Sequence, residues 1–162
     1  MRLIFYASPM HDVGKIGVPD HILLKSEGLN DEEWKIMQSH TQMGAEILGG
    51  SNGEILQLAA QIALTHHERW DGSGYPRGLA GPEIPIAGRI LAVADVWDAL
   101  RSERPYKSAS TVEESRAIME EAGGTQLDAE ILKVFLERLD VVNRIEEEAA
   151  KTDGGSKSPP PT

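Results

Sequence analysis

Residues 54–76 read EILQLAAQIALTHHERWDGSGYP, an apolar segment that runs into two histidines and then into glycine-rich sequence. Its apolar residues recur at the i, i+3, i+4, i+7 and i+8 spacing of one helical face, and they are Ile55, Leu58, Ala59, Ile62 and Ala63. His66 and His67 lie four residues beyond Ile62 and Ala63, so they continue that inward face. The segment therefore predicts a core helix that ends in two inward-facing histidines.

The segment over 68–85 that follows is polar and rich in glycine and proline, which excludes regular secondary structure. Gly72 and Gly74 permit the positive φ values that a tight turn needs, and Pro76 stiffens the far side of the turn. Long loops in compact domains tend to be functional. We therefore expect this loop to contribute to a site, although an ordinary surface loop is the alternative.

Helical patterns also dominate the rest of the chain. Three pairs have capping-box spacing: Asn30 with Glu33, Ser51 with Glu54, and Thr111 with Glu114. Residues 1–8 resemble the last turns of a helix, and further helices are expected over about 31–48, 86–101, 112–122 and 128–147. In the helix over 31–48, Trp34 and Met37 are placed on the inner side. These patterns predict an all-α domain over residues 1–145 and a disordered tail over 146–162, where Glu, Ala, Gly, Ser and Pro prevail.

Composition restricts the function. The net charge of −10, from 26 acidic and 16 basic residues, argues against binding of long nucleic acid. The absence of cysteine excludes disulfides and thiolate metal sites. No apolar run reaches the roughly 18 residues of a membrane span, and no signal peptide is recognisable at the N-terminus. We expect a cytoplasmic protein without membrane partners, in which a phosphorylated ligand would need cations at its site.

Histidines and aspartates supply the chemical signal. A single inward-facing histidine is usually a hydrogen-bonded core residue. For Asp95, which interrupts an apolar helix, the alternative to a metal ligand is a carboxylate in a salt bridge. Four such histidines together with two aspartates instead favour a metal centre; they are His11, Asp12, His40, His66, His67 and Asp95. Nitrogen and oxygen ligands of this kind suit Fe, Mn, Co, Ni or Zn more than Ca, and paired metals suit phosphodiester cleavage.

Two further features concern the same site. Asp12, adjacent to His11, has two carboxylate oxygens and can bridge neighbouring metals. Lys15 lies four residues beyond His11, where it can hold a phosphate oxygen or remain a solvated lysine.

Several motifs occur in a distinctive order. They are His11-Asp12-Val13-Gly14-Lys15, His40 with Gly44-Ala45-Glu46, the segment 66–76, Val93-Ala94-Asp95-Val96, and Arg104-Pro105-Tyr106-Lys107. In order and spacing, about residues 5–140 resemble the HD-GYP branch of the HD-domain phosphohydrolases. The resemblance implies an HD-domain-like helical bundle with a long Gly/Pro-rich loop, and a metal-dependent phosphodiesterase of bacterial second-messenger signalling. It would hydrolyse cyclic di-GMP to linear pGpG or GMP.

The resemblance also implies roles for individual residues. Two or three divalent ions, iron or manganese, would be held by His11, Asp12, His40, His66, His67 and Asp95, with Asp12 bridging. Lys15 would contact the scissile phosphate, and the dinucleotide would be gripped by Tyr75, Arg104 and Lys107. Glu68 would orient a ligand imidazole. A diguanylate-cyclase (GGDEF) domain, or an upstream sensor or receiver domain, would be the protein partner.

The chain departs from the family pattern at its start. Family members carry a further histidine and, in three-metal forms, a glutamate on helices upstream of the His-Asp pair, and residues 1–10 contain neither. We therefore expect a domain that lacks its first helices and one metal with an incomplete ligand set. A catalytically weak metal- or dinucleotide-binding module is the main alternative. A nucleotidase acting on a mononucleotide fits the loop, Arg104 and Lys107 less well.

Overall fold

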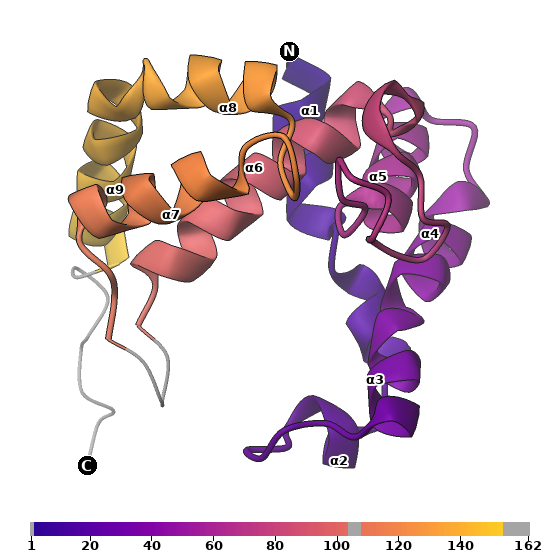
Figure 1. Ribbon diagram of the computed structural model, residues 1–162. Coiled ribbons are helices and arrows are strands. Elements are labelled where there is room, and N and C mark those ends of the chain that lie inside the picture. The colour runs from indigo at the N-terminus through magenta and orange to yellow at the C-terminus, as the bar shows by residue number, and fades with distance from the viewer. Residues whose placement is uncertain (1, 104–107, 154–162) are drawn as a thin grey trace, which may run out of the picture.

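A computed structural model describes residues 2–103 and 108–153, and this part of the chain is helical (Figure 1). The helices are α1 (Arg2–Ala7), α2 (Asp20–Leu23), α3 (Asp31–Gln38), α4 (His40–Gly49), α5 (Glu54–Thr65), α6 (Ile86–Arg101), α7 (Val112–Ala122), α8 (Ala129–Leu136) and α9 (Leu139–Asp153). Isolated bridges, Asp71 to Ala80 and Gly123 to Leu127, are the only β pairing among the described residues. The predicted all-α class is confirmed.

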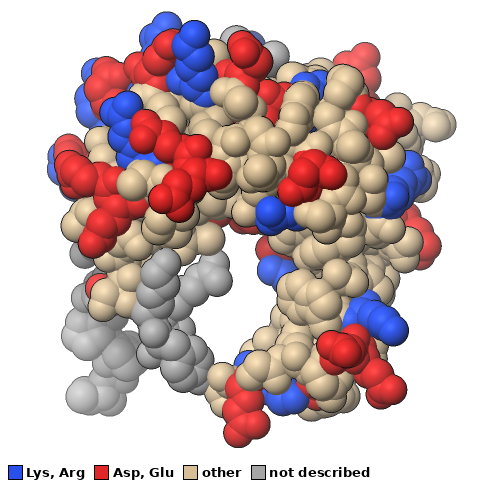
Figure 2. All heavy atoms as spheres, viewed as in Figure 1, with Lys and Arg blue, Asp and Glu red and all other residues tan. Residues whose placement is uncertain are grey.

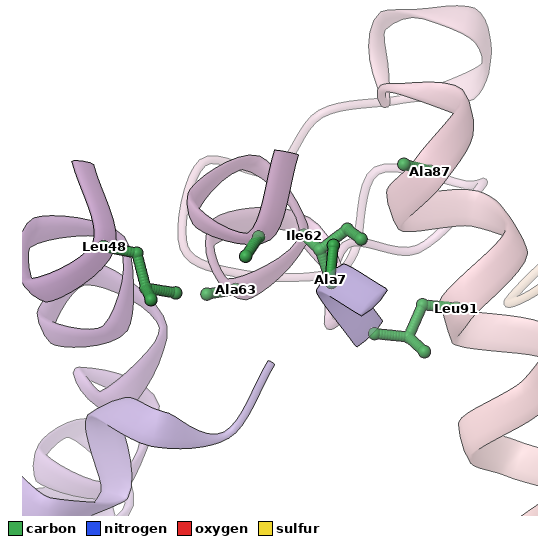
Figure 3. Packing of buried hydrophobic residues seen from close by; sticks show 7 residues of the cluster. Ala7, Leu48, Ile62, Ala63, Ala87 and Leu91 are labelled. Atoms are coloured by element: carbon green, nitrogen blue, oxygen red, sulfur yellow. The ribbon is translucent and has the colours of Figure 1, made fainter. Parts of the chain in front are cut away.

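Helix α6 joins two hydrophobic clusters. The first packs α1, α4, α5 and α6 together, and its buried members are Ala7, Leu48, Ala59, Ile62, Ala63, Ala87 and Leu91. Figure 3 shows Ile62 and Ala63 of α5 between Leu48 of α4 and the α6 side chains. The second cluster lies between α6 and the C-terminal helices and contains Val93, Trp97, Met119, Leu127 and Leu132. The predicted inward face of α5 is confirmed at Ala59, Ile62 and Ala63 and is wrong at Ile55, which is 38% exposed. The bounds predicted for α6 and α7 are confirmed.

The single helix predicted over 31–48 is wrong, because the chain breaks at Ser39 into α3 and α4. The Ser39 amide donates to the carbonyls of both Lys35 and Ile36, which closes α3. The next helix, α4, begins at His40. No residue of α3 is buried, and Trp34, predicted to face inward, is 47% exposed.

The helix predicted over 128–147 is also two helices, α8 and α9, which meet at Glu137 and Arg138. Helix α9 continues through Asp153, and the Glu146 carboxylate accepts a hydrogen bond from the Trp97 indole N–H. The predicted start of the tail at residue 146 is therefore wrong, because this part of the chain packs on α6. Residues 154–162 lie outside the described part.

The capping boxes predicted at Asn30 and Thr111 are confirmed. The one predicted at Ser51 is wrong, because Gly53 caps α5 and the Ser51 hydroxyl instead accepts from the Gly53 amide. None of the helices in the described ranges has both the length and the apolar character needed to cross a bilayer. Figure 2 shows acidic side chains gathered over the C-terminal helices.

Candidate metal centre

The histidines and aspartate predicted as ligands converge from three separate segments. Asp12 lies in a turn after α1, His40 begins α4, and His66 and His67 directly follow α5. Asp12, His40, His66 and His67 each offer one nitrogen or oxygen atom, and these atoms lie within 4.8 Å of one another. His40 and His66 are fully buried. The fold thus assembles a compact group of metal-binding atoms from residues far apart in the sequence.

Two glycines allow these segments to approach so closely. A Cβ at Gly14, in the 3-10 helix η2 (Val13–Gly17), would overlap the carbonyl oxygen of His40. A Cβ at Gly44 of α4 would lie 3.2 Å from the Cβ of Ala63 on α5. The backbones of η2 and α4 are therefore in direct contact, and α4 packs closely on α5. This packing places Asp12 against the three imidazoles.

Backbone carbonyls orient three of the imidazoles. The Nδ1 atom of His11 lies 2.8 Å from the Ser8 carbonyl oxygen, and that of His40 lies 2.6 Å from the Met37 oxygen. The His66 Nδ1 atom lies 3.0 Å from the Ala63 oxygen. A carbonyl only accepts hydrogen bonds, so these Nδ1 atoms carry the proton and the Nε2 lone pairs face the centre. Metal-binding histidines are oriented in the same way.

The two carboxylate oxygens of Asp12 face different partners. Oδ1 lies 3.5 Å from His40 Nε2 and 3.7 Å from His66 Nε2. Oδ2 lies 3.3 Å from His11 Nε2, which in turn is 3.9 Å from Asp95 Oδ1. Oδ1 is buried and has no hydrogen-bond partner in the described part of the chain. Because an unpartnered buried carboxylate oxygen is costly, the site fits a cation at Oδ1.

The protonation states also suit a metal. Burial raises the pKa of the Asp12 carboxyl, but the interactions with His11, His66 and Lys15 outweigh burial and hold that pKa far below its usual value. Burial, together with the neighbouring His66 and His40, lowers the pKa of His67 to about 3. Burial also lowers the pKa of His40. At neutral pH the site therefore presents the Asp12 carboxylate and neutral imidazoles at His40 and His67, the forms that bind divalent ions, whereas the hydrogen bond to Asp12 raises the pKa of His11.

Lys15 and Asp95 flank this group. The Lys15 ammonium lies 2.6 Å from Asp12 Oδ2, one turn further along the chain. The apolar residues around Asp95 predict a buried carboxylate in α6, and this prediction is wrong, because its side chain is 38% exposed. The solvent-facing side of α6 carries Asp95 into a cleft, where the carboxylate lies near His11 without being enclosed.

The cleft has a volume of about 850 Å³. It is lined by the predicted site residues that the structure describes: His11, Asp12, Lys15, His40, His66, His67, Glu68, Tyr75 and Asp95. Arg104 and Lys107, also predicted to bind the dinucleotide, lie outside the described residues. The cleft has further lining residues that sequence patterns did not assign to a site, including Trp34, Met37, Gln38, Arg69, Ser73 and Gln126. Gln126 lies between α7 and α8, where no sequence signal connects it to the histidines.

Glu68 holds the glycine-rich loop. Its carboxylate is buried and accepts from the Arg77 amide at 2.8 Å and from the Leu79 amide at 3.0 Å. No hydrogen bond joins Glu68 to an imidazole among the described residues, and the role of orienting a ligand imidazole stays a prediction. Gly74 lies against the same helix end, and a Cβ there would come within 2.6 Å of the His67 carbonyl oxygen. The Tyr75 ring consequently stacks on the His67 ring, with centroids 4.8 Å apart.

The other end of the loop is tied to the C-terminal helices through Arg89. Its guanidinium contacts the buried Asp128 carboxylate at 2.8 Å, and its Nε donates to the Ile84 carbonyl at 2.8 Å. The same guanidinium lies over the Trp70 ring. Asp128 also caps α8. The loop that carries Tyr75 is therefore anchored both at the helix end beside the histidines and at the start of α8.

Comparison with known proteins agrees with this geometry. A family model described as an HD domain matches residues 2–131. The chain belongs to the HD-domain family. Its relatives and its motifs place it in the predicted HD-GYP branch.

Several relatives share most of this HD domain. The chain is 52% identical over 156 residues to a cyclic di-GMP phosphodiesterase of Thermotoga maritima, an alignment that covers 94% of this chain and 42% of the relative. It is 48% identical over 138 residues to the 3'3'-cGAMP-specific phosphodiesterase 2 of Vibrio cholerae, covering 85% of this chain and 26% of the relative. The chain thus spans less than half the length of these relatives.

A solved structure shares the fold. The crystal structure of a cyclic GMP-AMP specific phosphodiesterase of Vibrio cholerae superposes with a TM-score of 0.64 at 17% identity. The superposition covers 85% of this chain and 38% of that one. It supports the HD-domain arrangement of helices.

Proposed function

We propose that this HD domain is a metal-dependent phosphodiesterase that hydrolyses cyclic di-GMP to linear pGpG or GMP. The observation that carries the proposal is the Asp12 carboxylate, with one buried oxygen facing His40 and His66 and the other facing His11. Relatives that share up to 52% of its residues are cyclic di-GMP phosphodiesterases. Some relatives are specific for 3'3'-cGAMP, so other cyclic dinucleotides are the alternative substrates.

The proposed ligand sets follow the two sides of Asp12. His40, His66, His67 and Asp12 Oδ1 would hold one ion, and His11, Asp95 and Asp12 Oδ2 would hold its neighbour. Iron or manganese suits these nitrogen and oxygen donors. Such ions, when bound, polarise a phosphoryl oxygen and lower the pKa of water.

The chain's own residues would position the phosphodiester. Lys15, whose side chain is 40% exposed beside Asp12, would contact the scissile phosphate. Burial and the charges of Asp12 and Asp95 raise the pKa of the Tyr75 phenol, which therefore stays protonated and can donate a hydrogen bond to the ligand. Arg104 and Lys107 would complete the grip on the dinucleotide. A cleft of about 850 Å³ lies within the range of small-molecule sites.

The test is turnover of cyclic di-GMP by the purified protein loaded with Fe(II) or Mn(II), followed by chromatography of the products. Asp12→Ala is expected to abolish turnover and to lower the bound metal measured by elemental analysis. Asp140→Ala, which removes an exposed carboxylate on α9, is the matched control and should leave both unchanged. Turnover that survives in Asp12→Ala would contradict the metal mechanism.

A binding module is the second candidate, favoured by the uneven ligand sets. Four donor atoms converge on the Asp12 Oδ1 side, whereas on the other side His11 and Asp95 are 3.9 Å apart and partly open to the cleft. Such a module would bind metal or dinucleotide and contact a diguanylate-cyclase (GGDEF) or sensor domain. Tight binding of cyclic di-GMP without any turnover, in the metal-loaded protein, would favour this candidate.

A further inference from the structure

Trp34 is a large aromatic side chain that the hydrophobic core does not use. It lies on α3, a helix without any buried residue, and 47% of its surface is exposed. Trp97, by contrast, is 4% exposed in the second cluster, and Trp70 is half-buried with the Arg89 guanidinium over its ring. Burial in the core therefore does not account for a tryptophan at position 34. Trp34 instead lines the cleft that contains the metal-binding group.

A row of aromatic rings connects Trp34 to that group. The Tyr75 ring stacks on His67 at an interplanar angle of 30°. The Trp34 ring lies next to Tyr75, with centroids 6.1 Å apart and an interplanar angle of 77°. Because an edge-to-face contact engages at most one face of an indole, the other face of Trp34 remains available in the cleft.

The next turn of α3 adds suitable neighbours. Met37 and Gln38 follow Trp34 by three and four residues, so they lie on the same side of the helix, and both line the cleft. The Gln38 side-chain amide makes no hydrogen bond within the described ranges, so it can bond the edge of a base held against Trp34. A thioether, an indole face and a free amide together form a surface suited to a flat heterocycle.

We propose that Trp34 is a stacking platform for one purine base of the cyclic dinucleotide, an inference that rests on the proposed function. With one phosphate beside Asp12 and Lys15, the attached base would extend along the same cleft towards Trp34, which follows His67 and Tyr75 in the row of rings. Stacking of a base on an aromatic side chain depends on the flat π-face of the base, so this contact contributes affinity for any purine.

Steady-state kinetics of the Mn(II)-loaded protein test the inference with cyclic di-GMP. Trp34→Ala should raise KM by roughly 5- to 150-fold, the equivalent of about 1–3 kcal/mol of stacking, and change kcat little. Trp34→Phe should recover most of the loss, because it restores an aromatic face. Tyr6→Ala is the matched control, since Tyr6 is an aromatic residue 53% exposed on α1 outside the cleft. Because Trp34 lies outside the core, the melting temperatures of its variants should match the wild type.

Stopped-flow fluorescence separates this inference from the proposed function. On mixing with cyclic di-GMP, wild-type tryptophan emission should fall before product appears, and Trp34→Phe should lose that change. Quenching that depends on Trp34, without any turnover, would sustain the stacking role and overturn the phosphodiesterase. Turnover with no such quenching and an unchanged KM in Trp34→Ala would overturn the stacking role alone. Absence of both binding and turnover in the wild type would overturn both.

Discussion

Replacement of Glu68 by alanine should release the glycine-rich loop. The carboxylate is 3% exposed and accepts two backbone hydrogen bonds, from Arg77 and Leu79. A hydrogen bond to a charged group contributes about 1.5–3 kcal/mol, so loss of both should lower the free energy of loop opening by about 3 kcal/mol or more. At about 1.4 kcal/mol per tenfold change, the open fraction should rise by roughly 100-fold.

Amide hydrogen exchange measures this opening directly. In Glu68→Ala, the amides of Arg77 and Leu79 should exchange roughly 100-fold faster than in the wild type, because their acceptor is gone. Trypsin should cleave after Arg77 more rapidly for the same reason. Glu68→Gln keeps one acceptor oxygen, so its amide exchange rates should lie between those of the wild type and Glu68→Ala. Since Tyr75 lies in the same loop, KM for cyclic di-GMP should rise in parallel.

Glu83→Ala is the matched control. Glu83 belongs to the same loop, but within the described ranges its exposed carboxylate accepts only a 3.3 Å hydrogen bond from Ala80. This variant should leave the Arg77 and Leu79 amides protected. Unchanged exchange of these two amides in Glu68→Ala would refute the anchoring role. Equal acceleration at every amide, including those of the α6 core, would show that Glu68 stabilises the whole fold rather than the loop.

Three further outcomes are expected. Saturation with Mn(II) at about 100 times the dissociation constant should stabilise the wild type by about 2.7 kcal/mol, whereas His40→Ala should show little stabilisation in thermal unfolding. Arg89→Met should destabilise by about 3 kcal/mol in urea unfolding, because it leaves the buried Asp128 carboxylate unpaired, while Arg116→Met, in an exposed pair, should cost at most about 0.5 kcal/mol. The metal-free protein should lose stability as pH falls from about 6.5 towards 3, because unfolded His67 takes up a proton that the folded state, with its pKa lowered to about 3, resists. If the free energy of unfolding depended on pH as steeply in His67→Asn as in the wild type, this explanation would be contradicted.

The sequence by itself determined the helical fold and the histidines that converge. The apolar spacing of α5 depends on residues three and four positions apart, and it correctly placed Ala59, Ile62 and Ala63 in the core, with His66 beyond them. The capping boxes at Asn30 and Thr111 are equally local, because each involves a side chain and an amide three residues away. Such signals need no knowledge of the rest of the chain.

Tertiary structure decided what faces the cleft and what anchors the loop. Periodicity did not show the break at Ser39, nor that Trp34 faces the cleft rather than the core. The Glu68 carboxylate bonds amides nine and eleven residues away, a partnership set by the path of the loop rather than by helical spacing. Gln126 reaches the cleft where its segment pairs with the glycine-rich loop, since the Trp70 and Asp71 amides donate to the Gln126 and Thr125 carbonyls. These contacts join segments whose relative positions exist only after the core has formed, so no local pattern in the sequence encodes them.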